Sequence, residues 1–220
     1  MYKPRLAILL SGNGSNLQAL INAIQNGDLI AEIVLVLSNK ADVGGIKRAQ
    51  NAGIENIVID NLGYPDRKSF DYALKSKLEK YNPDLIILAG FMRILTAEFV
   101  RHFEGQVLNI HPSLLPKYRG LNTHLNAINA GDKISGATVH FVTSELDGGA
   151  PIIQAKVPIL ENDTPEVLAK RILIKEHQIY PLAVRWFCEG RLSLVDEIAK
   201  LDSVILPKTG LIFNDAMIDK

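Results

Sequence analysis

The sequence of 220 residues predicts an α/β fold with a doubly wound, mainly parallel sheet and an antiparallel element in its C-terminal half. Two patterns carry this prediction. In the first half, short apolar runs alternate with segments of helical periodicity, which is typical of parallel strands joined by covering helices. In the second half, two strand-like runs stand on either side of the Gly-rich segment TSELDGGAP, which favours an antiparallel pair.

The first half begins with an apolar run at residues 6–10 that stops at Ser11 and Gly12, and this run predicts the first strand. Apolar residues then recur at helical spacing from Leu17 to Ile24, which predicts an amphipathic helix. The alternation continues, with strands expected at residues 33–37, 56–59, 85–89 and 107–110 and helices at residues 44–52, 66–81 and 96–102.

The second half is expected to contain a helix near residues 121–130 and strands at residues 137–142 and 151–157. Thr164 can cap a further helix that starts at Pro165 and continues toward Phe187. Pro181 should kink or interrupt that helix. The tail after Gly190 has no clear periodicity, could add a short strand and is assigned no function. With no repeat or linker, residues 1–220 are expected to form a single domain.

The composition excludes several classes of protein. Twenty-four basic residues balance twenty-four acidic ones, so nothing predicts broad attraction to nucleic acid or to an anionic membrane. The N-terminal apolar run is too short for a signal peptide or a membrane span, and a cytoplasmic protein is expected. The single cysteine, Cys188, excludes an internal disulfide. Monomer and homo-oligomer both stay open.

The segment SGNGSNLQ, residues 11–18, stands between the first strand and the first helix. Glycines allow close backbone approach, and a helix N-terminus offers unpaired N–H groups, so a phosphate is a natural ligand. The segment lacks the Lys of a Walker A loop, and Leu17 stands where a dinucleotide fingerprint has its third glycine. A tight turn with Asn and Ser side chains capping the helix is the alternative.

A second candidate site follows the fifth strand, where Asn109 and His111 are two residues apart and therefore share a face. An amide can donate to an oxyanion, and a histidine can supply a proton or a positive charge. Asp147, in the Gly-rich segment, is a potential partner for the imidazole. The alternative is a turn-capping Asn and a His satisfied by backbone. No metal-binding pattern and no serine or cysteine nucleophile motif is present, so no metal is expected.

Several motifs together resemble the folate-dependent phosphoribosylglycinamide formyltransferase family. They are SGNGSNLQALI, SNKADVGGIKRA, LAGFMRIL, NIHPSLLPKYRG and HFVTSELDGGAPIIQAKV, and they occur in order from about Leu6 to about Arg191. The resemblance implies the Rossmann-like formyltransferase fold, with glycinamide ribonucleotide as acceptor and 10-formyltetrahydrofolate as co-substrate, in purine biosynthesis. The segment RGLNTH after Tyr118 departs from members with Pro at Arg119 and His at Asn122.

The resemblance also implies roles for individual residues. Asn109, His111 and Asp147 match the catalytic three, with Asn109 and protonated His111 stabilising a tetrahedral intermediate and Asp147 assisting. The ribonucleotide would be bound by Gly14, Ser15, Asn16 and Glu176. The folate would be bound by Arg67, Met92, Arg93, Ile94, Leu95, Asn109, Thr143, Ser144, Glu145, Leu146 and Asp147.

Three alternatives stay open. A formyltetrahydrofolate hydrolase would share the core but carry an added N-terminal regulatory domain. A methionyl-tRNA formyltransferase would carry an added RNA-binding domain, and the near-zero net charge counts against tRNA. A non-catalytic Rossmann-like module that binds a phosphorylated ligand is the alternative from another class, against which the set of Asn109, His111 and Asp147 counts.

Overall fold

The computed structural model describes residues 2–218. The chain forms two compact units, Met1–Asn109 and Ile110–Lys220. The expectation of a single domain stays a prediction.

The first unit is built on five parallel strands in the order β5-β4-β1-β2-β3. They are β1 (Arg5–Leu10), β2 (Glu32–Ser38), β3 (Asn56–Val58), β4 (Leu85–Leu88) and β5 (Val107–His111), whose last two residues belong to the second unit. Leu9 of β1 pairs with Leu37 on one side and Leu88 on the other. The central strands are buried on both faces, which explains why they read as unbroken apolar runs.

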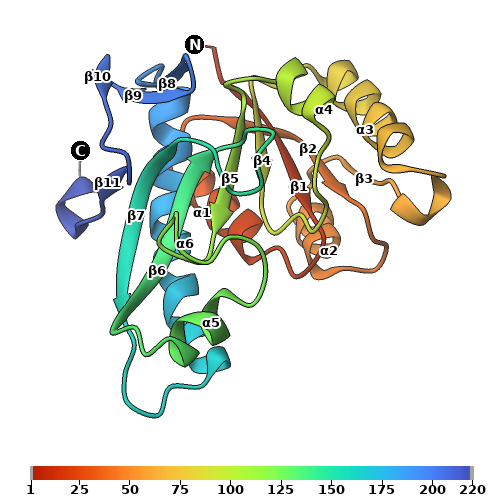
Figure 1. Cartoon of the computed structure of the whole chain (residues 1–220). Coiled ribbons are helices and arrows are strands. Elements are labelled where there is room, and N and C mark those ends of the chain that lie inside the picture. The colour runs from red at the N-terminus through yellow and green to blue at the C-terminus, as the bar shows by residue number, and fades with distance from the viewer. Residues whose placement is uncertain (1, 219–220) are drawn as a thin grey trace. The chain divides into compact units, whose positions relative to one another are not determined.

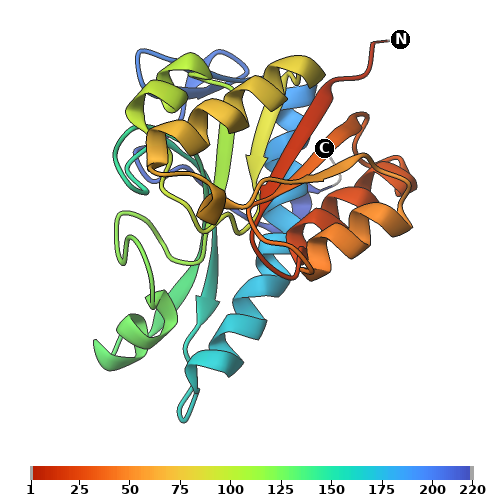
Figure 2. The ribbon, with the colours of Figure 1, turned by 90° about the vertical axis from the view of Figure 1, so that its right-hand side faces the viewer.

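Helices cover both faces of these strands. They are α1 (Ser15–Asn26), α2 (Gly44–Asn51), α3 (Arg67–Tyr81) and α4 (Ala97–His102), with the 3₁₀ turn η1 (Asn61–Gly63) before α3. Figure 2 shows α1 and α2 on one face and α3 and α4 on the other. Right-handed crossovers require this, because the strand order runs one way from β1 to β3 and the other way from β4 to β5. The order therefore reverses between β1 and β4, where ligands of such sheets bind.

The second unit contains the long strands β6 (Ile134–Phe141) and β7 (Pro151–Pro158), which pair antiparallel. Helix α6 (Pro165–Cys188) packs along both strands, as Figure 1 shows, and α5 (Thr123–Asn129) packs on α6. The C-terminal segment adds β11 (Leu211–Ile212), parallel to β7, and η2 (Asp215–Met217). A second, antiparallel sheet has the order β10-β9-β8, from β8 (Leu192–Val195), β9 (Ile198–Leu201) and β10 (Val204–Ile205).

The predicted α/β class, the mainly parallel sheet and the antiparallel pair are confirmed, with most boundaries within three residues. Interruption at Pro181 is wrong, because α6 is continuous from Pro165 to Cys188. Tyr180 and Ala183, on either side of the proline, are fully buried, and burial of this apolar face offsets the lost backbone hydrogen bond. In its described part, up to residue 218, the tail adds four strands rather than one. Among residues 2–218, no helix is both long enough and apolar enough to cross a membrane.

Candidate active site

The first loop at the strand reversal, residues 11–14, follows β1 and leads into α1. Gly14 has φ 75°, and a Cβ added there would lie 2.5 Å from the Gly45 Cα at the start of α2. Only glycine fits this left-handed and crowded position. The residue at the N-cap of α1 is Gly14, which has no side chain, so the expectation that an Asn or Ser occupies this cap is wrong. The loop thus brings backbone N–H groups to a helix N-terminus, as a phosphate site requires.

Arg48 of α2 fixes the conformation of this loop. Its guanidinium donates to the backbone oxygen and the side-chain Oδ1 of Asn13, each at 2.9 Å, and to Gln18 Oε1 at 3.1 Å. The Gly45 N–H also donates to the Gly12 carbonyl at 3.0 Å. The sequence alone did not point to Arg48, although this residue lies in the motif SNKADVGGIKRA.

The second loop at the strand reversal, residues 89–96, joins β4 to α4 and carries four of the predicted folate contacts. Met92 and Ile94 are 63% and 49% exposed, whereas Leu95 is buried. The Arg93 guanidinium lies over the Phe70 ring, 5.8 Å from its centroid. The loop therefore presents two exposed apolar side chains on a partly anchored backbone, as expected of a surface that covers a flat ring system.

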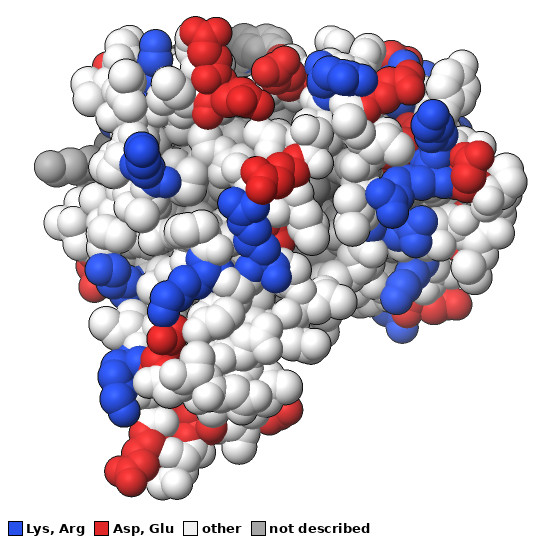
Figure 3. Space-filling view, viewed as in Figure 1, with Lys and Arg blue, Asp and Glu red and all other residues white. Residues whose placement is uncertain are grey.

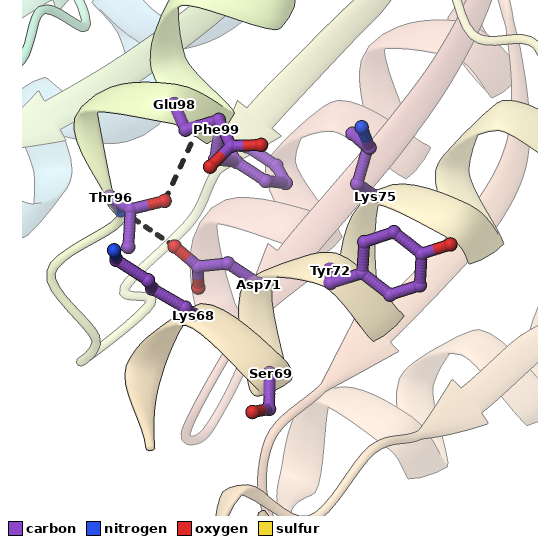
Figure 4. Close-up of a pocket in the computed structure, with 8 residues that line it drawn as sticks. All are labelled: Lys68, Ser69, Asp71, Tyr72, Lys75, Thr96, Glu98 and Phe99. Carbon is purple, nitrogen blue, oxygen red and sulfur yellow. Dashed lines mark hydrogen bonds between the residues drawn. The ribbon is translucent and has the colours of Figure 1, made fainter.

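Asp71 of α3 anchors the far end of this second loop. It is 3% exposed and accepts a hydrogen bond from the Thr96 N–H at 2.6 Å, and Thr96 in turn caps α4 (Figure 4). Burial raises the pKa of the Asp71 carboxyl, while the Thr96 hydrogen bonds and the charges of Arg67 and Arg93 act in the opposite direction. Arg67 is the first residue of α3 and is exposed.

A pocket of about 410 Å³ lies beside this anchor, between α3 and α4 (Figure 4). Its lining residues are Lys68, Ser69, Asp71, Tyr72, Lys75, Thr96, Glu98 and Phe99. None of them is a predicted site residue. The pocket therefore lies outside the predicted site. It is next to the loop at residues 89–96, which carries four of the predicted site residues.

In the second unit, the structure brings His111 and Asp147 together. His111 Nδ1 lies 3.4 Å from Asp147 Oδ2, and the side chains are only 7% and 9% exposed. His111 Nε2 lies 2.8 Å from the Tyr118 backbone oxygen. Both ring nitrogens thus face acceptors, and an imidazolium, which has two N–H donors, satisfies both. The geometry therefore suits a charged His111 stabilised by a buried carboxylate.

The loop between β6 and β7 positions Asp147 and contains the other predicted folate contacts of this unit. Asp147 has a left-handed backbone, φ 47°, and its Oδ2 accepts from the Gly120 N–H at 2.8 Å. Ser144, Glu145 and Leu146 are exposed, and Glu145 forms an ion pair with Arg119. The segment at residues 118–120 and the loop of Asp147 are therefore joined at two points.

Two further histidines lie beside this pair. His140 is 2% exposed, its Nδ1 donates to the Phe141 carbonyl at 2.7 Å, and its Nε2 is 3.8 Å from Asp147 Oδ1. Burial lowers the pKa of His140 to about 4, so its ring is neutral near pH 7. Burial and the charge of His111 also lower the pKa of His124, on α5. The sequence alone did not point to either histidine, because a strand position and a helix position do not reveal that both lie near His111.

Asp132 fixes the segment whose carbonyl contacts His111. The Tyr118 hydroxyl donates to Asp132 at 2.9 Å, and Lys117 Nζ donates to both carboxylate oxygens, also at 2.9 Å. A pocket of about 360 Å³ adjoins this network. These contacts hold Tyr118 in its left-handed backbone conformation, with φ 54°.

The remaining predicted residues are distributed over both units. Asn109 is half-buried in β5, two residues before His111, and pairs with Leu88 of β4. Glu176 lies on α6 and is 8% exposed. Within residues 2–218, no group of three or more His, Cys, Asp or Glu side chains is arranged to bind a metal. On the face shown in Figure 3, basic and acidic side chains are interspersed rather than gathered by sign.

Comparison with known proteins connects these features to one family. The formyl transferase family model matches residues 4–184. The phosphoribosylglycinamide formyltransferase of Haemophilus influenzae is 50% identical over 206 residues, which cover 94% of this chain and 97% of that protein. The Escherichia coli enzyme of the same name is 47% identical over 205 residues, with 93% and 97% covered. A solved structure of the Coxiella burnetii enzyme matches with a TM-score of 0.93 and 47% identity, covering 97% of this chain and 100% of that one.

Proposed function

Since this chain belongs to the phosphoribosylglycinamide formyltransferase family, we propose that it transfers the formyl group of 10-formyltetrahydrofolate to the amine of glycinamide ribonucleotide. This reaction belongs to purine biosynthesis, and we place it in the cytoplasm. The structural observation that supports it most is the buried pair of His111 and Asp147, which places an imidazole at the end of β5 in contact with a carboxylate.

The ribonucleotide phosphate binds at the start of α1, where Gly14, Ser15 and Asn16 offer backbone N–H groups. Helix dipoles favour an anion at this position, and Arg48 holds the loop in the receptive conformation. Glu176 of α6 recognises the glycinamide end, where a carboxylate can accept hydrogen bonds from the amide or the amine. These assignments extend the family resemblance to individual residues.

The folate contacts that the family resemblance implies fall in two sets of residues. Met92, Arg93, Ile94 and Leu95 line the pterin with Arg67 on the same side. The second set is Thr143, Ser144, Glu145, Leu146 and Asp147, and Asn109 contacts the formyl group. The exposed side chains of Met92, Ile94 and Leu146 supply apolar surface for the flat ring.

In the chemical step, the amine nitrogen attacks the formyl carbon and the carbonyl oxygen becomes an oxyanion. Asn109 donates a hydrogen bond to that oxygen, and His111 stabilises it as a cation. The bond between the carbon and folate N10 then breaks, and the proton lost by the amine balances the one gained by N10. His111 gives up its hydrogen bond to the Tyr118 carbonyl and donates to the substrate instead. Asp147 meanwhile keeps the imidazole charged and oriented.

The test is the ultraviolet change that accompanies conversion of 10-formyltetrahydrofolate to tetrahydrofolate by the purified chain. Conversion that requires glycinamide ribonucleotide supports the transferase. Conversion in its absence indicates a formyltetrahydrofolate hydrolase. No conversion under either condition leaves a non-catalytic module that binds a phosphorylated ligand.

A further inference from the structure

We propose that Ser11 is a positioning residue that couples ribonucleotide binding to folate binding. It joins the two loops that meet at the strand reversal of the first unit, residues 11–14 and residues 89–96. This inference rests on the proposed function, because it uses the assignment of the first loop to the ribonucleotide and of the second to the folate.

Ser11 holds the second loop through both its backbone and its side chain. The Ser11 N–H donates to the Gly90 carbonyl at 3.1 Å, and the Met92 N–H donates to Ser11 Oγ at 2.7 Å. Ser11 is 6% exposed, so water competes little for these groups. The backbone of the loop that presents Met92 and Ile94 is therefore set directly by Ser11.

The hydroxyl of Ser11 is itself oriented by a chain of two asparagines. Ser11 Oγ donates to Asn39 Oδ1, and Asn39 Nδ2 donates to Asn61 Oδ1 at 2.8 Å. Asn39 is 2% exposed and follows β2, while Asn61 lies in η1. Because the hydroxyl proton is committed to Asn39, its lone pairs point to Met92 rather than rotating freely.

Ser11 is also the first residue of the loop at residues 11–14, which leads to the proposed phosphate site at the start of α1. A ligand that fixes the backbone at Gly14 and Ser15 reduces the motion of Ser11, three residues earlier. The second loop is then already ordered when folate arrives, so folate binding has a smaller entropic cost. Linkage requires the reverse effect, in which folate strengthens ribonucleotide binding by the same factor.

The proposal is tested by calorimetric titration of glycinamide ribonucleotide into the full chain, with and without saturating tetrahydrofolate. The ratio of the two dissociation constants measures the coupling. We expect a ratio of at least about 5 in the unmodified protein, which is the lower end of typical coupling. Ser11→Ala should bring the ratio close to 1.

Ser38→Ala is the matched control, because Ser38 is fully buried and its hydroxyl bonds only within its own turn, to the Lys40 carbonyl at 2.7 Å. The Ser38→Ala variant should keep the same ratio of dissociation constants as the unmodified protein. Asn61→Ala removes the half-buried last member of the hydrogen-bonded series Ser11, Asn39 and Asn61, and it should give an intermediate ratio. This variant therefore provides a test even where Ser11→Ala does not fold.

Equal ratios in the unmodified protein and in Ser11→Ala overturn the proposal, as does a ratio of 1 in the unmodified protein. With a misfolded Ser11→Ala, an unchanged ratio in Asn61→Ala overturns it. Failure of the proposed function looks different, because the unmodified protein would then fail to bind at least one of the two ligands and no ratio could be measured.

Discussion

Asp147 Oδ2 contacts His111 Nδ1 at 3.4 Å while it also accepts the Gly120 N–H at 2.8 Å. The carboxylate therefore fixes the imidazole and the neighbouring segment at residues 118–120 together. Both side chains are almost fully buried, where the attraction between opposite charges is stronger than in water. The proposed reaction depends on this pair.

His111→Ala should lower kcat by roughly 100- to 1000-fold, because a donor to the developing oxyanion is lost. The ultraviolet assay at saturating concentrations of both substrates measures this. His102→Ala is the control, since His102 is 41% exposed and pairs with Glu79 on the surface of the first unit. A His111→Ala enzyme with normal turnover would remove the proposed role.

Arg48→Ala should raise KM for the ribonucleotide by roughly 10-fold and leave kcat nearly unchanged. The three hydrogen bonds from Arg48 hold the phosphate loop rather than the reacting atoms, so their loss affects binding. Lys47→Ala, one residue earlier and exposed, is the control for loss of a positive charge on α2. An unchanged KM in Arg48→Ala would contradict the assignment of this loop.

Asp132→Ala should lower kcat by roughly 5- to 50-fold although Asp132 does not contact His111. Its loss frees Tyr118 and Lys117, and small displacements of positioning groups are costly in catalysis. Asp163→Ala is the matched control, because Asp163 pairs with Arg171 in the same unit but does not contact Tyr118. Equal kcat values in the two variants would show that Asp132 has no such role.

Stability should fall as the pH drops from about 6.5 toward 4, because His140 is buried and neutral. Its pKa is lowered from 6.5 to about 4 in the folded chain, so in this window the unfolded chain binds more protons. The full loss is on the order of 3 kcal/mol and is complete below the folded pKa.

Urea denaturation at a series of pH values measures this effect, with His140→Asn as the comparison because asparagine does not titrate. The stability advantage of the unmodified protein over the variant should shrink through the window. Parallel stability curves would contradict a neutral, buried His140.

The sequence predicted the strands of the first unit well because those strands are buried on both faces, as the unbroken run at residues 6–10 shows. It also paired His111 with Asp147 across thirty-five residues of chain, since a carboxylate is a suitable partner for an imidazole that acts in catalysis. It missed Ser11, Arg48 and His140 as supporting residues. Their roles come from contacts between distant segments, such as Ser11 with Met92, which periodicity and local spacing do not encode.

The central claim is that the formyl group moves to glycinamide ribonucleotide, and following an isotopic label in that group tests it most directly. Labelled 10-formyltetrahydrofolate is incubated with the ribonucleotide and either the unmodified protein or His111→Ala, and the products are separated by chromatography. The account predicts label on the ribonucleotide with the unmodified protein and almost none with the variant. Label released as free formate by the unmodified protein would contradict it.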